Sequence, residues 1–229
     1  MAEDYLDLGA KLEKHGHLDQ ALNAFENALQ ADPGNADAWF SKGRILSRME
    51  NYEEAIRAYD QAIALRPGFA KAWCNKGIVL GVLDRDQEAV SALDQAINQD
   101  PKLVEAWYNK GLALRDLGSY PEAVQAFDQA IALDPESNDA WYSKGVALRL
   151  MQRYDEALAA LGKSLEIYGD DADAWYESAR VRLFLGDANG SLQALAKAIE
   201  NDEDYKENVT QDQDFQPLWE NPELKKLLS

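Results

Sequence analysis

The side chains that most often do chemistry in proteins are few in this chain, and their spacing does not suit catalysis. The sequence has one cysteine, Cys74, and two histidines, His15 and His17, which flank Gly16. A nucleophile needs a base beside it, and a structural zinc ion needs four protein ligands, so this set supports neither site. The sequence also has no glycine-rich phosphate-binding loop. We therefore expect a protein that is not an enzyme and that holds no metal and no cofactor.

Recognition chemistry is better represented, by arginines at regular positions. Four of them stand five or eight residues after a tryptophan: Arg44, Arg115, Arg149 and Arg180. A guanidinium group can pair with a carboxylate through two parallel hydrogen bonds. These arginines therefore predict a ligand with an acidic side chain or a C-terminal carboxylate. The alternative is that they pair with acids of the chain itself, such as Glu105, Asp116 and Asp139.

Two asparagines share a second regular position, two residues after a tryptophan. They are Asn75 and Asn109, and Ser41 and Ser143 occupy the same position in neighbouring segments. A side-chain amide both donates and accepts hydrogen bonds, so it suits a peptide group whatever side chains the ligand carries. The pair predicts contacts to a peptide backbone. The alternative is that both are ordinary solvated polar residues.

The tryptophans that define these positions recur every 34 residues, as Trp39, Trp73, Trp107, Trp141 and Trp175. Series of prolines, glycines and small residues keep the same step; they begin at Pro33, Gly9, Ala21 and Ala28. A fixed period of this length is typical of a repeat architecture in which each period is one supersecondary unit.

The unit spanning residues 104–137 indicates what one period contains. Trp107 and Leu114 fall on one face of a first helix. Ser119 and Glu122 then have the spacing of a capping box, which predicts the start of a second helix. A single hairpin cannot bury both of its faces, so neighbouring hairpins must stack on one another.

This period and its pattern of Trp, Gly, Ala, aromatic and Pro residues resemble the tetratricopeptide repeat family. The resemblance implies an all-α fold, a right-handed superhelical solenoid of antiparallel helix hairpins. Some wording, such as Trp-Tyr-Asn-Lys-Gly, is similar to archaeal or bacterial members. The resemblance covers six repeats, at residues 2–35, 36–69, 70–103, 104–137, 138–171 and 172–205.

The chain departs from the family pattern at four lysines, which stand where the family usually has leucine: Lys42, Lys76, Lys110 and Lys144. We expect their apolar stems to lie along the surface and their ammonium groups to stay in water.

Residues 206–229 follow the last repeat and are rich in large apolar side chains, including Phe215, Leu218 and Trp219. A helix is expected to start at Asn221-Pro222. We interpret this stretch as a C-terminal capping segment that covers the face left open by the last hairpin. The alternative is a mobile tail.

The face of each first helix opposite its Trp, Gly and Leu is formed by the residue two before the Trp and those one, two, five, eight and nine after it. In the family this face lines the concave groove that holds ligands, although residues there can also pack between repeats. We expect Cys74 to be a small residue lining this groove. The predicted peptide-binding groove residues are Phe40, Arg44, Asn75, Ile78, Tyr108, Asn109, Leu112, Arg115, Tyr142, Val146, Arg149, Tyr176 and Arg180.

Composition narrows the class of partner. The chain has 41 acidic and 23 basic residues, a net charge of −18, which disfavours nucleic acid and anionic membrane surfaces. No run of about 18 apolar residues and no signal segment is apparent, so we expect a cytoplasmic protein.

The function that these features predict is a protein-protein interaction scaffold that binds a peptide or extended segment of a partner in the groove. The two-carboxylate clamp known in the family would need lysine and asparagine where this chain has aromatic and aliphatic residues, so binding of chaperone tails is not expected. The alternative is a self-assembling solenoid whose ends or convex faces mediate homo-oligomerisation.

Overall fold

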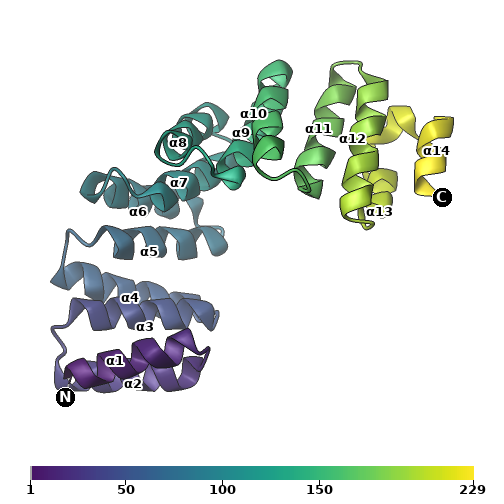
Figure 1. Cartoon of the computed structure of the whole chain (residues 1–229). Coiled ribbons are helices and arrows are strands. Elements are labelled where there is room, and N and C mark those ends of the chain that lie inside the picture. Colours follow the sequence, from purple (N-terminus) through teal and green to yellow (C-terminus); the bar gives the residue numbers. More distant parts are fainter. Residues whose placement is uncertain (1) are drawn as a thin grey trace. The chain divides into compact units, whose positions relative to one another are not determined.

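The structure is a computed structural model that describes residues 2–229. The described residues form fourteen α-helices and one short 3-10 helix, and they contain no strand. The all-α prediction is confirmed. Figure 1 labels the helices along the chain. They group into two compact units, Met1–Leu117 and Gly118–Ser229.

The first unit contains three helix hairpins and one further helix. Each hairpin packs two consecutive helices against each other, and the second helix of one hairpin contacts the first helix of the next. Every first helix has 13 residues and every second helix has 14. The helices are α1 Ala2–Lys14, α2 Leu18–Ala31, α3 Ala36–Arg48, α4 Tyr52–Leu65, α5 Ala70–Val82, α6 Asp86–Gln99 and α7 Val104–Asp116.

The second unit repeats this arrangement and ends in shorter elements. The pairs α9 with α10 and α11 with α12 form hairpins, and α8 packs on α9 as α10 packs on α11. The elements are α8 Tyr120–Leu133, α9 Asn138–Leu150, α10 Tyr154–Ile167, α11 Ala172–Phe184, α12 Ala188–Asn201, α13 Tyr205–Gln211, η1 Gln213–Leu218 and α14 Pro222–Leu228. The helix start expected at Asn221-Pro222 is where α14 begins, and Asn221 accepts a capping hydrogen bond from the Glu223 N–H.

Four hairpins close tightly because a glycine of the first helix faces a large side chain of the second helix. A Cβ atom added at Gly43 would lie 2.6 Å from the buried ring of Tyr59. One added at Gly77 would lie 2.6 Å from Cγ of Leu93. These approaches explain why glycine recurs on the first helix at the same step as a large apolar residue on the second.

The periodic tryptophans hold the ends of the preceding helices. Each indole Nε1 donates a hydrogen bond to the carbonyl of the residue six positions earlier, which in four cases is the periodic proline. The distance is 3.0 Å from Trp39 to Pro33 and 2.9 Å from Trp107 to Pro101. Trp and Pro therefore share one period because the same hydrogen bond between them recurs in four repeats.

The four lysines that depart from the family pattern were expected to keep their ammonium groups in water, but each makes an ion pair and a contact with a tryptophan ring. Lys76 Nζ lies 2.6 Å from a carboxylate oxygen of Asp60 and 5.6 Å from the ring centroid of Trp73. The other lysines make the equivalent two contacts. Only 21–22 % of each lysine side chain is exposed. Each ammonium group is paired with an acid on the second helix of the preceding hairpin, so these lysines link neighbouring hairpins.

The capping box predicted for α8 is wrong. The Ser119 side chain makes no capping hydrogen bond, and its ψ is 60°. Ser137, which does accept a capping bond from the Ala140 N–H, has a ψ of 98°. The equivalent turn residue Asp187 has a ψ of 73° and does accept a capping bond from the Gly190 N–H, so the turn conformation by itself does not exclude a cap.

The turn inside each hairpin needs one residue with positive φ. These residues recur with the period of the chain, and three are not glycine: Gly16, Glu50, Asp84, Gly118, Gln152 and Gly186. The left-handed conformation favours glycine, so Glu50 and Gln152 occupy a strained backbone position.

No helix in the described part of the chain combines the length and the apolar character needed to cross a membrane.

Candidate functional site

The candidate site in the first unit is the face shared by α3, α5 and α7. Helix α5 contacts both α3 and α7 on this side, so the three first helices form one surface. All eight predicted groove residues of this unit are half-buried: Phe40, Arg44, Asn75, Ile78, Tyr108, Asn109, Leu112 and Arg115.

Cys74 does not line this face. It is 2 % exposed and belongs to the core cluster, so our expectation for it is wrong. Burial raises the pKa of the thiol to about 12, which keeps it protonated at neutral pH and unreactive. The Cys74 side chain faces the neighbouring helices because α5 is packed on both sides.

A first pocket, of about 220 Å³, lies between α3 and α5 and is called the α3–α5 pocket. Burial raises the pKa of Tyr59 in its wall to about 12, and a hydrogen bond from the Asn75 side chain acts in the opposite direction. The pocket is lined by Arg44, Ser47, Arg48, Tyr59, Asn75, Ile78 and Val79.

The α3–α5 pocket carries two arginines that share one acid. Arg44 donates a short hydrogen bond to Glu13 of α1, and Arg48 Nη1 lies 3.5 Å from the second carboxylate oxygen of Glu13. The Arg44 guanidinium is also 5.7 Å from the ring centroid of Phe40. Two positive groups facing one negative group leave this end of the face with a surplus positive charge.

A second pocket, also of about 220 Å³, lies between α5 and α7 with the start of α6 as one wall, and is called the α5–α7 pocket. It shares Ile78 with the first pocket. Val82 in its lining is 56 % exposed, which is high for a large apolar side chain. The lining residues are Gly77, Ile78, Gly81, Val82, Asp86, Ala89, Asn109, Leu112, Ala113 and Asp116.

The α5–α7 pocket has the opposite charge. Burial raises the pKa of Asp86 above its ordinary value, and the negative charges of Asp116 and Asp84 raise it further. Asp116 is paired with Arg115, whose Nε lies 2.9 Å away. Asn109 in the wall donates to the Glu105 carbonyl at 2.7 Å. The two pockets are therefore adjacent but differ in sign.

Sequence reasoning missed several lining residues of these pockets. Arg48, Val82 and Asp116 stand nine residues after a tryptophan, a position that helix geometry already assigns to this face. Asp86 carries no such signal, because it is the first residue of α6 and reaches the pocket only through the hairpin fold.

In the second unit the predicted groove residues lie on α9 and α11. Tyr142, Val146 and Arg149 of α9 are half-buried, whereas Tyr176 of α11 is 7 % exposed. Burial raises the pKa of Tyr142 above its ordinary value, and the carboxylates of Glu177 and others nearby raise it further.

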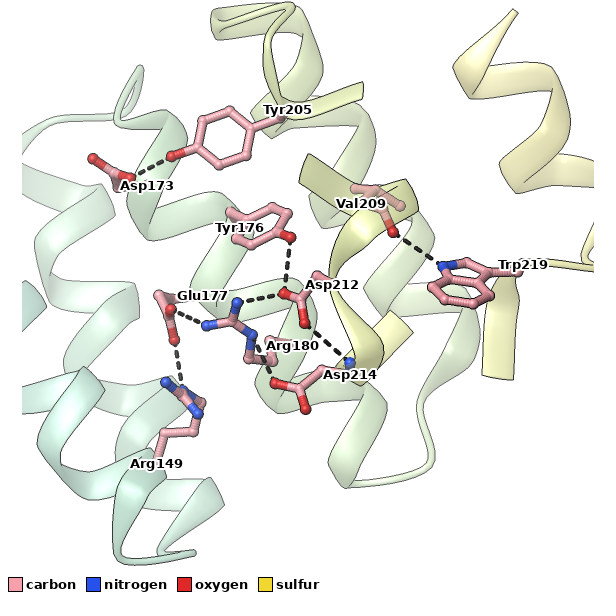
Figure 2. A network of polar contacts seen from close by, with 10 residues as sticks. All are labelled: Arg149, Asp173, Tyr176, Glu177, Arg180, Tyr205, Val209, Asp212, Asp214 and Trp219. Carbon is pink, nitrogen blue, oxygen red and sulfur yellow. Dashed lines mark hydrogen bonds and ion pairs between the residues drawn. The ribbon is translucent and has the colours of Figure 1, made fainter. Parts of the chain in front are cut away.

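Figure 2 shows a polar network that ties the face of α11 to the end of the chain. Arg149 Nε donates to Glu177 at 2.7 Å, and Arg180 donates to the other oxygen of Glu177. Arg180 also donates to Asp212, and the Tyr176 hydroxyl lies 2.9 Å from the same Asp212 oxygen. Burial alone would lower the pKa of Arg180, but these carboxylates hold it above its ordinary value.

A contact between aromatic rings and two further hydrogen bonds reinforce this network. The Phe215 ring centroid is 5.1 Å from that of Tyr176, and Phe215 is fully buried. Tyr205 of α13 hydrogen-bonds Asp173 of α11, and Trp219 Nε1 donates to the Val209 carbonyl at 3.0 Å. The C-terminal segment thus covers Tyr176 and Arg180.

All four predicted arginines pair with carboxylates of the chain, as the alternative reading of the sequence had it. Of the acids named there, only Asp116 is used, by Arg115. The remaining partners are Glu13, Glu177, Asp212 and Asp214. Among residues 2–229, no three His, Cys, Asp or Glu side chains are grouped so that they could hold a metal ion.

Comparison with known protein families identifies the repeat that the sequence pattern predicts. Profiles described as Tetratricopeptide repeat match residues 6–68, 43–104, 85–135, 108–172 and 172–205. No curated protein sequence matches the chain.

Several solved structures are similar to this chain. YrrB, described as a TPR protein with an unusual peptide-binding site, is 25 % identical, with a TM-score of 0.69 over 79 % of this chain and 93 % of that one. A MamA structure is 27 % identical, with a TM-score of 0.67 over 75 % and 93 %. PilW, described as a widely conserved type IV pilus biogenesis factor, has a TM-score of 0.77 over 95 % and 97 %. PilW is only 21 % identical, so that likeness shows the fold alone.

Proposed function

Because this chain belongs to the tetratricopeptide repeat family, we propose that it is a protein-interaction scaffold whose face on α3, α5 and α7 binds an extended peptide segment of a partner. The observation that carries the proposal is the pair of adjacent pockets that share Ile78. An extended peptide directs the side chains of one of its sides into such a row of pockets, and ligand sites are concave and partly apolar.

Two further features support this proposal. Asn75 lines the α3–α5 pocket and Asn109 lines the α5–α7 pocket, where a side-chain amide can hydrogen-bond a peptide group. YrrB, which matches most of this chain, is described as having a peptide-binding site. Peptide binding in YrrB does not identify the ligand of this chain, but it favours the same class of ligand.

We assign the binding to the first unit because the face of α11 is occupied. Tyr176 and Arg180 contact Asp212 and Phe215, so a ligand would have to displace the C-terminal segment to reach them. We further propose that residues 206–229 cap the last of six repeats, and that Tyr142 and Val146 of α9 supply peptide contacts of their own.

The experiment that tests the proposal is a selection of peptides from a random peptide library displayed on phage, with the intact protein as bait. Enriched peptides are then synthesised with a fluorescent label and their affinity is measured by anisotropy. We compare the wild type with Ile78→Ser, which changes the wall shared by both pockets. We expect a drop in affinity of about tenfold, equivalent to about 1.4 kcal/mol.

The matched control is Ile131→Ser on α8, a buried isoleucine of the second unit that lines neither pocket. It should reduce stability and leave peptide affinity unchanged at temperatures where the protein is folded. Equal affinity of wild type and Ile78→Ser would overturn the assignment to this face. Self-assembly, the alternative function, predicts a mass that rises with protein concentration, which light scattering on the same samples measures.

A further inference from the structure

We infer that the peptide bound by the α3, α5 and α7 face carries an acidic group and a lysine or arginine about three residues apart. The acidic group enters the α3–α5 pocket and the basic side chain enters the α5–α7 pocket. This inference rests on the proposed function and adds the chemistry of the ligand to it.

The acidic group is assigned from the charge balance of the α3–α5 pocket. Arg44 and Arg48 are both near Glu13, and the Glu13 side chain is only 13 % exposed. One carboxylate cannot neutralise two guanidinium groups. A ligand carboxylate, from a side chain or a chain end, would complete the pair by accepting hydrogen bonds from the arginine that Glu13 engages less closely.

Arg48 is that arginine. Its Nη1 is 3.5 Å from Glu13, and its side chain is 49 % exposed. The Arg44 contact to Glu13 is much closer. Because both Arg48 and Ser47 line the pocket, a carboxylate that enters it finds a guanidinium and a hydroxyl donor.

The basic side chain is assigned from the α5–α7 pocket. Asp86 has no ion-pair partner among the described residues, and the negative charges of two further aspartates, Asp84 and Asp116, act on it to raise its pKa. Arg115 offsets only the charge of Asp116. A cationic group from the ligand would relieve the mutual repulsion of these carboxylates.

The walls of this pocket favour a lysine or arginine over a small cation. Ile78, Val82 and Leu112 form apolar sides, and Asp86 and Asp116 supply the negative groups. A lysine or arginine side chain has a matching distribution, an apolar stem with a charged end. Burying part of the exposed Val82 side chain would add to the affinity.

The spacing of about three residues follows from the helices. The pockets lie on the two sides of α5, so they are separated by about one helix packing distance, roughly 10 Å. An extended peptide in the polyproline II conformation advances about 3.1 Å per residue and returns to the same side every three residues, so side chains about three residues apart can enter adjacent pockets.

The test repeats the random-peptide selection with charge-reversal variants of the intact protein. Peptides enriched by the wild type should contain an acid and a Lys or Arg about three residues apart. Asp86→Lys should enrich peptides with an acid in place of the base, and Arg48→Glu should enrich peptides with a base in place of the acid. A wild-type peptide should lose about five- to tenfold in affinity for either variant.

Asp19→Lys and Arg57→Glu are matched controls. Asp19 lies in the first turn of α2, as Asp86 lies in the first turn of α6, but Asp19 is exposed and lines neither pocket. Arg57 is exposed on α4 and lines neither pocket. Both controls should select the wild-type pattern. Circular dichroism melting establishes that every variant is folded before the selection.

The outcomes separate the two proposals. Suppose that the affinity of the selected peptides falls in Ile78→Ser, but that the peptides share no charge pattern or that every variant selects the same pattern. That result would overturn this inference and leave the proposed function standing. Peptides whose affinity is insensitive to Ile78→Ser would remove the proposed function and this inference with it. Exchange of the selected charge in both variants supports both.

Discussion

Arg180 of α11 donates a hydrogen bond to Asp212, the residue whose other carboxylate oxygen caps η1 through the Asp214 N–H. One carboxylate thus joins the last full hairpin to the C-terminal segment and starts the next element. Tyr176 adds a third hydrogen bond to the same side chain. The end of the chain is held to α11 by a polar contact whose loss should be measurable.

We predict that Asp212→Asn destabilises the second unit by about 2 kcal/mol. Removing the carboxylate leaves the Arg180 charge poorly compensated. The expected loss of stability is smaller than for a fully buried ion pair because this pair is only partly buried. Urea unfolding followed by circular dichroism measures the effect. Asp204→Asn, at an exposed position whose side chain makes no capping bond, is the control and should change stability by under about 0.5 kcal/mol.

The same carboxylate predicts a response to acid. Burial opposes the charged form of Asp212, but hydrogen bonds from Arg180 and the Asp214 N–H dominate, so its folded pKa lies below the ordinary value of 3.8. The stabilisation is therefore fully present above pH 3.8 and is lost as the pH falls through the lower folded value.

The measurement is hydrogen exchange of residues 205–229 at pH values from neutral down to below that ordinary value. We expect protection of this segment to fall in the acid range in the wild type. In Asp212→Asn protection should already be low at neutral pH and should change less with acid. An identical acid response in both proteins would assign the effect to other carboxylates.

The turn in the hairpin of α9 and α10 offers a stabilising substitution. Gln152 has a φ of 59°, a conformation in which glycine occupies the equivalent turns at Gly118 and Gly186. Gln152→Gly relieves this strain but increases the conformational entropy of the unfolded chain. We expect a net gain in the free energy of unfolding of about 0.5 kcal/mol. Thermal melting measures it. The reverse change, Gly186→Gln, should lower stability by about 1 kcal/mol, and a gain there would contradict the argument.

Glycines inside helices should differ sharply in their tolerance of alanine. Gly77→Ala places a Cβ atom 2.6 Å from Leu93 Cγ across the hairpin and should destabilise the first unit by about 1–3 kcal/mol. Gly162→Ala on α10 meets nothing within 4 Å and should stabilise by about 0.5–1 kcal/mol, because alanine is the better helix former. Equal effects in chemical unfolding would contradict the packing explanation.

The amino-acid sequence by itself determined the helices. The 34-residue step of Trp39 and its equivalents, the prolines that end second helices and the glycines on first helices were sufficient to predict paired helices, because each contact repeats between neighbours and involves residues close in the chain. Helix geometry also placed Ile78, Asn75 and Leu112 on the face that contains both pockets, and the position nine after the tryptophan would have added Arg48 and Asp116.

Only the tertiary structure decided which charges are satisfied. Glu13 meets Arg44 from another hairpin, 31 residues away, and Asp212 meets Arg180 across 32 residues. The sequence contains far more acids than arginines, so spacing alone could not select the partners. Burial of Cys74 was likewise decided by packing on both sides of α5. Asp86 lines a pocket because the hairpin turn brings the first residue of α6 beside α5 and α7, and the direction set by a turn cannot be predicted from helical periodicity.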